Sequence, residues 1–496
     1  MKRMISELKR ALSAAIIVSL STILLAAQDP KPSSKGLVIK GKAPISKEVL
    51  KVKLPRAFET KLGNGMQVIV LEAPKLPTFA MQMIIQSGGL TDPEDLHGAA
   101  LSTAASLQEG TKTRTSKQIA EQVGSLGASL SAASGLSSLE SRVFASGLTD
   151  SFDQILALFA DVILNPSFPA DELKKFKTRA LGQLRLQRAQ PGFLADEMFA
   201  KVMYGSHPAA RIALTAADIQ RLTPEALQRF HAAHYKPNNA IFAIVGDVKP
   251  MEVLAKLEKA FGSWQRGDVP RNSISKVSEP GGAKIFLINR VPSVQANLVV
   301  GNLAIERSDP DYFALDVMNQ VIGGGVTSRL FMNLREDKGY TYGAYTGLSA
   351  PRYRGTFRAS TEVRTDATKG SMNELMYEIK RIRDEKVQPE EFDRTKRTLI
   401  GAFALQLESP QALLNNIVTQ KLYALPADYW DTYTQKLAAI TPDDVQRVAR
   451  KYLDLSRLQI VAVGDASKIA EVLRQFGIVE IYDTEGKPVR SSAEGK

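Results

Sequence analysis

The sequence predicts an α+β fold made of two homologous domains, each an α+β sandwich in which helices cover an antiparallel-rich sheet. Two separated segments of the chain share one pattern, and their strand-like and helix-like runs are grouped rather than strictly alternating. The length of 496 residues supplies enough apolar side chains for more than one hydrophobic core.

The shared pattern is a helix, a strand and a second helix. In both copies a Thr-Pro pair opens the first helix, with threonine as the N-cap and proline at the first helical position. A tyrosine closes that helix, an apolar strand ends in Gly-Asp, and an amphipathic helix follows. Thr223 and Thr441 are 218 residues apart, as are Gly246 and Gly464. This constant offset indicates a duplication, because chance similarity would not keep the register.

The repeats and the composition between them divide the chain into five segments. The first has a basic start, an apolar run and a small-residue cleavage site before Gln28, which is typical of a signal peptide. It predicts an exported, periplasmic protein that contacts a membrane only if the signal segment is retained. The segments are a signal peptide at 1–27, an extended tether at 28–54, a first domain at 55–264, a linker at 265–283 and a second domain at 284–485.

Composition restricts the chemistry available to this chain. Cysteine is absent, so disulfides, thiolate nucleophiles and cysteine metal sites are excluded. Four histidines leave few candidates for metal ligands or general bases. The net charge is +12, but the basic residues are interspersed with acidic ones. This pattern is typical of a solvated surface and does not favour nucleic-acid binding.

The stretch Val321–Tyr345 holds the most functional information. Its glycines Gly323, Gly324 and Gly325 form a loop that can take positive φ and let another backbone approach. A short helix is expected to follow, ending at Gly339. Arg335 lies near the end of this helix and Tyr342 comes seven residues later. A glycine loop, a guanidinium and a phenol are suited to holding a peptide backbone.

Three phrases in the chain are GGGVTSRLFMNLREDKGYTYG, YKPNNAIFAIVGD and LFADVILNPSFP. Together they resemble the insulinase or pitrilysin-type metallopeptidases. This group includes the processing-peptidase subunits of mitochondria and the core proteins of respiratory complexes. The resemblance covers roughly residues 55–480 and implies two similar α+β domains around a substrate chamber. Active members hold zinc with an inverted H-x-x-E-H helix and a distant glutamate.

The chain departs from this family at the zinc helix. The segment DLHGAALSTAASLQEGT corresponds to it, and the motif positions fall on Leu101, Ala104 and Ala105. Gln183 stands at or near the place of the distant glutamate. Leucine and alanine have no lone pairs for zinc, and without a glutamate at 104 no general base activates water. We therefore expect no catalytic residue and no bound cofactor in this chain.

Two other groups of side chains offer weaker alternatives for a metal site. His97 precedes the altered motif and Glu109 follows it, but a histidine at a loop–helix junction is more often a hydrogen-bonding surface residue. His231 and His234 share a helix face, with Glu225 earlier on that helix. A structural or solvent-facing role is the favoured interpretation of this pair.

The resemblance implies that Arg335 and Tyr342 hold the substrate backbone and the scissile carbonyl. The alternative is that Arg335 pairs with Glu336 or Asp337 while Tyr342 packs on the sheet. The glycines at 323–325 resemble the substrate-recognition loop of non-catalytic processing-peptidase subunits, or they form only a tight turn.

These expectations lead to one functional hypothesis and two alternatives. The chain is expected to be the non-catalytic, substrate-binding subunit of an exported heterodimeric zinc peptidase. Its partner would be a catalytic insulinase-type subunit carrying H-x-x-E-H and the zinc ion, and the substrate a peptide or unfolded protein. The alternatives are a catalytically silent scaffold and a peptidase with relocated metal ligands.

Overall fold

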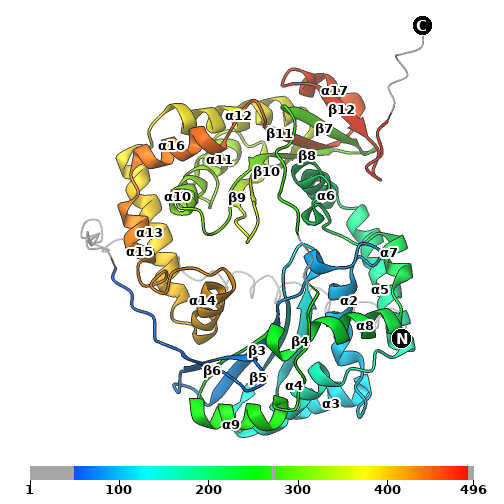
Figure 1. The fold of residues 1–496 in the computed structure, drawn as a ribbon. Coiled ribbons are helices and arrows are strands. Elements are labelled where there is room, and N and C mark those ends of the chain that lie inside the picture. Colours follow the sequence, from blue (N-terminus) through cyan, green and yellow to red (C-terminus); the bar gives the residue numbers. More distant parts are fainter. Residues whose placement is uncertain (1–49, 271–273, 490–496) are drawn as a thin grey trace, which may run out of the picture. The chain divides into compact units, whose positions relative to one another are not determined.

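The computed structural model describes residues 50–270 and 274–489, which contain two mixed six-stranded sheets (Figure 1). The predicted signal peptide and residues 28–49 of the predicted tether lie outside the described residues. The first sheet has the order β1-β2-β6-β3-β5-β4. Its strands are β1 Phe58–Lys61, β2 Gln67–Glu72, β3 Thr78–Ile85, β4 Ser129–Ser134, β5 Ser141–Leu148 and β6 Ala240–Gly246.

The second sheet repeats this arrangement with the order β12-β7-β11-β8-β10-β9. Its strands are β7 Lys284–Asn289, β8 Gln295–Leu303, β9 Thr341–Leu348, β10 Thr356–Arg364, β11 Gln459–Gly464 and β12 Val479–Tyr482. In each sheet a late strand, β6 or β11, enters between two early strands. It runs parallel to one of them and antiparallel to the other. The expected duplication and the antiparallel-rich α+β class are confirmed.

Helices lie on both faces of these sheets. Those of the first half are α2 Ala99–Ser106, α3 Ser116–Ser125, α4 Phe152–Leu164, α5 Ala170–Arg188, α6 Pro191–Tyr204, α7 Ala216–Arg221, α8 Pro224–His234 and α9 Pro250–Phe261. Those of the second half are α10 Tyr312–Ile322, α11 Arg329–Phe331, α12 Thr368–Asp384, α13 Pro389–Gln406, α14 Pro410–Leu422, α15 Tyr433–Ala439, α16 Pro442–Tyr452 and α17 Ala466–Arg474. A π-helix, η6 Met332–Asp337, continues α11.

Capping explains where the repeated helices begin. The Thr223 hydroxyl accepts a hydrogen bond from the Ala226 N–H at 3.2 Å at the start of α8. At α16, Thr441 and Asp444 form a reciprocal capping box. Proline occupies the first helical position in both, where its missing N–H costs no intrahelical bond. The threonine N-caps predicted from the repeat are therefore present.

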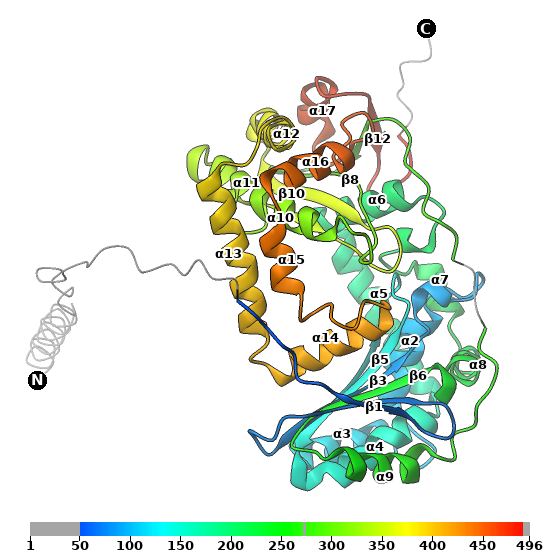
Figure 2. The ribbon, with the colours of Figure 1, turned by 60° about the vertical axis from the view of Figure 1, so that its left-hand side comes forward.

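Each sheet has one face covered by a helix from the other half of the chain. In the first sheet, Ile241 and Val245 of β6 pack with Leu414 and Val418 of α14, and Figure 2 shows this helix beside the strands. Each such side chain contributes roughly 1.5–3 kcal/mol when fully buried. The amide of Gln82 also donates to the Asn415 side chain at 3.2 Å.

The second sheet is covered in the same way by α6. Met198 and Phe199 of this helix join a cluster with Val299 of β8 and Val461 of β11. Because both faces of the central strands are buried, β6 and β11 are buried along their whole length and, apart from Gln459 at the start of β11, apolar rather than alternating. The reciprocal exchange of α6 and α14 ties the two halves together.

The described end of the predicted tether lies against the second half. The Leu54 N–H donates to the Asp431 carboxylate at 3.0 Å, and Arg56 forms an ion pair with the same carboxylate at 2.5 Å. Leu54 is buried in the core of the second sheet. No helix within 50–270 or 274–489 is both long and apolar enough to span a bilayer.

Candidate functional site

The helix that carries the family's zinc-motif positions is α2, which packs against β4 and α8. Its first turn is capped by Asp92, whose carboxylate accepts hydrogen bonds from the N–H groups of Gly98 at 2.6 Å and Ala100 at 2.8 Å. Gly98 has φ of +86°, a conformation that favours glycine. Burial raises the pKa of Asp92 to about 6. The N-terminus of α2 is thus fixed by side-chain contacts.

The three positions of the lost motif lie on this helix. Ala104 is buried, while Leu101 and Ala105 are half-buried and share a face because they are four residues apart. None of the three carries a lone pair that binds zinc. No group of three or more histidine and acidic side chains able to hold a metal occurs among the described residues. The side chains of α2 do not fit a zinc ion.

Gln183 belongs to α5, and an ion pair joins this helix to the residues that follow α2. Arg179 of α5 lies 3.4 Å from Glu109, just beyond the end of α2. Gln183 is exposed and one turn further along the same face of α5. Glu109 is therefore engaged in pairing with Arg179.

The histidines are held by separate interactions. His231 donates from Nε2 to the Ile163 carbonyl at 2.7 Å, and its ring stacks on Tyr235 at 4.5 Å. His234 is buried, with Nδ1 2.9 Å from the Ser87 hydroxyl. His97 is half-buried in the turn before α2. The structural interpretation of the 231/234 pair agrees with these contacts.

The lowered pKa values of the half-buried His231 and the buried His234 predict a loss of stability in acid. Burial lowers the pKa of His231 to about 4, whereas an exposed histidine in the unfolded chain titrates near 6.5. Below pH 6.5 the unfolded state therefore takes up a proton that the folded state excludes. We expect the free energy of unfolding to fall by about 1–2 kcal/mol between pH 7 and pH 5 because of His231 alone.

This expectation can be measured by urea unfolding at both pH values. The chain has two tryptophans, so Trp264 reports on the first half in a Trp430→Phe background. The His231→Gln variant should lose less stability than its parent over this pH interval. Equal losses in the two proteins would contradict the assignment.

Arg335 lies on the π-helix η6 and faces β9. Its Nη1 donates to the backbone carbonyl of Tyr342 at 3.1 Å, and its guanidinium lies 5.0 Å from the ring centre of Phe331. Its Nε is 3.4 Å from the Glu336 carboxylate, so the pairing considered as an alternative does occur. The side chain remains 45% exposed. Arg335 is held in place by these contacts and keeps further N–H donors for a ligand.

Tyr342 is an exposed residue of β9, an edge strand of the second sheet. Between Thr341 and Ala344, β9 has one residue more than the facing segment of β10, so Tyr342 lies in a β-bulge. Its side chain is 87% exposed. The alternative in which Tyr342 packs on the sheet does not fit this exposure. The structure brings Arg335 and Tyr342 together through the backbone of Tyr342.

The glycine loop joins α10 to α11 and contacts β9. A Cβ atom on Gly323 would lie 2.3 Å from the Thr346 nitrogen, and the Thr346 N–H donates to the Gly323 carbonyl at 2.9 Å. Gly323 is buried, whereas Gly324 is exposed and Gly325 is half-buried. None of the three has a positive φ. The close backbone approach expected of this loop is present at Gly323, and the positive φ is not.

Two family models match consecutive parts of the chain. Residues 67–216 match the model described as insulinase (peptidase family M16), and residues 221–399 match the one described as peptidase M16 inactive domain. The chain belongs to the insulinase family. The family predicted from the three sequence phrases is confirmed.

Named relatives of this insulinase-family chain extend over most of its length. An uncharacterized zinc protease of Streptomyces coelicolor is 25% identical over 79% of this chain and 86% of its own. One of Rickettsia bellii is 27% identical over 78% of this chain and 90% of its own. The crystal structure of a peptidase M16 inactive domain from Pseudomonas fluorescens has a TM-score of 0.76 and 29% identity. It covers 82% of this chain and 98% of that chain.

A charged pair near this site was not predicted from the sequence. Arg329 of α11 is buried and forms two hydrogen bonds to the Glu391 carboxylate of α13, at 2.9 and 2.8 Å. Spacing in the sequence indicates ion pairs only between neighbouring residues, and this pair joins positions 62 residues apart. The only indication of this pair in the sequence was that Arg329 stands among the apolar positions of a short helix.

Proposed function

We propose that this insulinase-family chain is the exported, non-catalytic subunit of a two-chain zinc peptidase. In this proposal Arg335 and Tyr342 contact the peptide bound at the partner's zinc site. One observation carries it: α2 has no metal ligand and no general base at its motif positions, while a positioned guanidinium and an exposed phenol are kept on η6 and β9.

The two side chains are suited to different parts of a peptide. Arg335 has N–H donors left after its bond to the Tyr342 carbonyl, and a guanidinium can hold a carbonyl as negative charge develops on it. The Tyr342 hydroxyl adds a donor at an exposed position. Because β9 is an edge strand, an extended peptide could also pair with its backbone.

The partner has to supply what α2 lacks. Zinc with a bound water and a nearby glutamate provides the nucleophile and the general base for hydrolysis. A partner with an intact H-x-x-E-H helix would carry both. Relatives named zinc proteases support a peptidase context for this chain. The predicted signal peptide at 1–27 supports assembly outside the cytoplasm.

The decisive experiment compares the chain alone with the chain bound to a catalytic insulinase-type subunit. We expect no zinc-dependent peptide hydrolysis by the chain alone and hydrolysis by the complex. Replacing the glutamate of the partner's H-x-x-E-H by glutamine should abolish that activity. Hydrolysis by the isolated chain, with one bound zinc per chain by elemental analysis, would reject the proposal and favour relocated ligands.

A catalytically silent scaffold is the second candidate function. It is favoured by the same lack of metal ligands at the motif positions of α2. It predicts that no H-x-x-E-H protein copurifies with the chain from its native periplasm. It also predicts that variants at Arg335 and Tyr342 leave peptide hydrolysis unchanged.

A further inference from the structure

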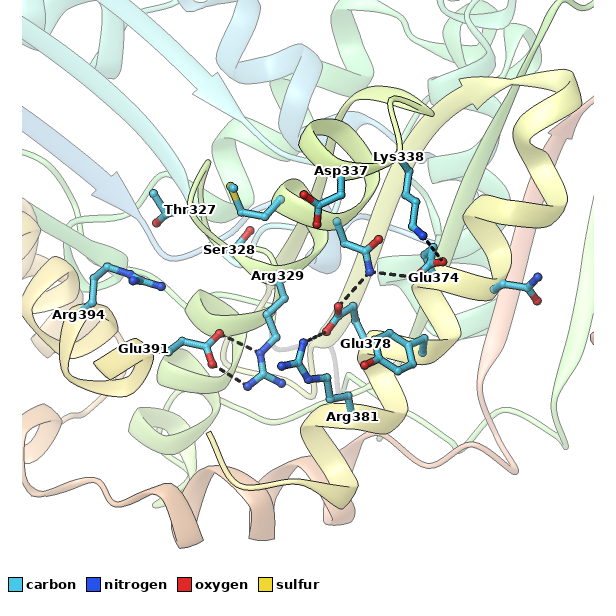
Figure 3. A pocket seen from close by; sticks show the side chains of 14 residues that line it. Thr327, Ser328, Arg329, Asp337, Lys338, Glu374, Glu378, Arg381, Glu391 and Arg394 are labelled. Atoms are coloured by element: carbon cyan, nitrogen blue, oxygen red, sulfur yellow. Dashed lines mark hydrogen bonds and ion pairs between the residues drawn. The ribbon is translucent and has the colours of Figure 1, made fainter. Parts of the chain in front are cut away.

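A polar pocket of about 720 Å³ lies between α11, η6, α12 and α13, as Figure 3 shows. Arg335 is not among its lining residues, so the pocket is separate from the proposed peptide site. Its volume is within the range of small-molecule sites in proteins. The side chains that shape it come from three separate parts of the second half of the chain.

The charges around this pocket balance. Four basic and four acidic side chains line it, which gives a formal net charge of zero. A simple anion would meet four carboxylates, and a metal cation would meet four basic groups. A ligand that carries both a positive and a negative charge is therefore favoured over a simple anion or a metal cation. The charged lining residues are Arg329, Lys338, Arg381, Arg394, Asp337, Glu374, Glu378 and Glu391.

The buried side of the pocket leaves one donor and one acceptor unused. The Arg329 side chain is 5% exposed and binds Glu391 through Nε and Nη2, while its buried Nη1 has no acceptor within the described chain. The Asn333 amide donates to Glu374 at 2.9 Å and to Glu378 at 3.0 Å. Its buried Oδ1 has no donor there either. Unsatisfied buried groups of this kind are costly without a ligand or water.

Two charged groups around the pocket are also without ion-pair partners among residues 50–270 and 274–489. They are the Arg394 guanidinium on α13 and the Asp337 carboxylate on η6, which Figure 3 shows on different helices. The other charged lining residues are paired. Arg381 contacts Glu378 at 3.5 Å, and Lys338 lies 3.7 Å from Glu374. One free positive group and one free negative group therefore remain for a ligand.

The backbone of this region is also unusual. Met332, Asn333 and Asp337 all lie on the π-helix η6. The Lys338 N–H donates to the Asn333 carbonyl at 3.0 Å, which is the i→i+5 bond of such a helix. π-Helical turns occur mostly as single turns, frequently at functional sites. This turn places Arg335 toward β9 and Asn333 toward the pocket.

From these observations we propose that the pocket binds a short peptide with a free α-ammonium and a free α-carboxylate. The exposed Arg394 guanidinium binds the carboxylate, and the exposed Asp337 carboxylate binds the ammonium. The pocket volume admits a peptide of a few residues. Binding of a peptide at this pocket does not depend on a catalytic partner.

Titration calorimetry on the full chain with trialanine tests this proposal. We expect saturable binding with a Kd of about 1 mM or tighter. N-acetylation or C-amidation of trialanine should each weaken binding at least about tenfold, because each removes one charge. Arg394→Gln should weaken the binding of trialanine but not the binding of the amidated peptide, which already lacks the carboxylate charge. Asp337→Asn should weaken the binding of trialanine but not the binding of the acetylated peptide, which already lacks the ammonium charge.

Matched controls are Arg397→Gln and Asp393→Asn, which change exposed charges on α13 outside the pocket lining. Both should bind trialanine as the parent does. Free alanine in place of trialanine shows whether one amino acid is sufficient. No saturable trialanine binding, equal binding of the blocked peptides, or equal loss in the controls would overturn the proposal. Tighter binding of inorganic phosphate than of trialanine would also overturn it.

Discussion

We expect the Arg335→Ala substitution to lower kcat/KM of the two-chain peptidase about 100-fold, which corresponds to about 2.7 kcal/mol of transition-state stabilisation. The substitution removes a guanidinium that the Tyr342 carbonyl and the Phe331 ring hold in one position. A donor held in advance costs no reorganisation when charge develops on the substrate carbonyl. The loss should therefore appear mainly in kcat.

Two further variants separate charge from geometry at this site. Arg335→Lys keeps the positive charge but loses the planar fork, so we expect an intermediate loss. Tyr342→Phe removes only the exposed hydroxyl and should leave the fold intact. Arg397→Ala on α13 serves as the control for a lost surface arginine and should leave kcat/KM unchanged. A loss below threefold for Arg335→Ala would remove this residue from the substrate site.

The duplication could be predicted because its indications are local in the sequence. Thr223 and Thr441 cap helices by contacts within three residues, and this chemistry is visible in the sequence itself. The absence of zinc-binding lone pairs at Leu101, Ala104 and Ala105 is a property of the residue types, and the absence of zinc from this chain stays a prediction. The glycines at 323–325 predict a close approach by another backbone, but not that Thr346 is the residue that approaches Gly323.

The exchange of helices could not be predicted in the same way. The apolar run of β6 indicates that both sheet faces are buried, but not that Leu414 of α14 covers one of them. The π-helix is equally hidden, because Met332–Asp337 has the composition of an ordinary α-helix. The pocket combines side chains such as Arg329 and Glu391 that only tertiary packing brings together.

The largest effect on stability should come from breaking the Arg329–Glu391 pair. In the Glu391→Leu variant the Arg329 guanidinium, whose side chain is 5% exposed, loses both of its carboxylate contacts. Removing one partner of a buried ion pair leaves an uncompensated charge and costs about 3–5 kcal/mol. Urea unfolding followed by Trp430 fluorescence in a Trp264→Phe background measures this cost, because Trp430 contacts Phe403 of α13.

The double substitution Arg329→Met with Glu391→Leu distinguishes charge burial from lost packing. If the single variant is destabilised because a charge is stranded, removing the arginine as well should restore most of the unfolding free energy. Glu390→Leu, one residue earlier and exposed, controls for a lost carboxylate in the first turn of α13 and should change stability by less than about 1 kcal/mol. A double variant no more stable than Glu391→Leu would show that the pair acts through packing between α11 and α13, and the electrostatic assignment would then fail.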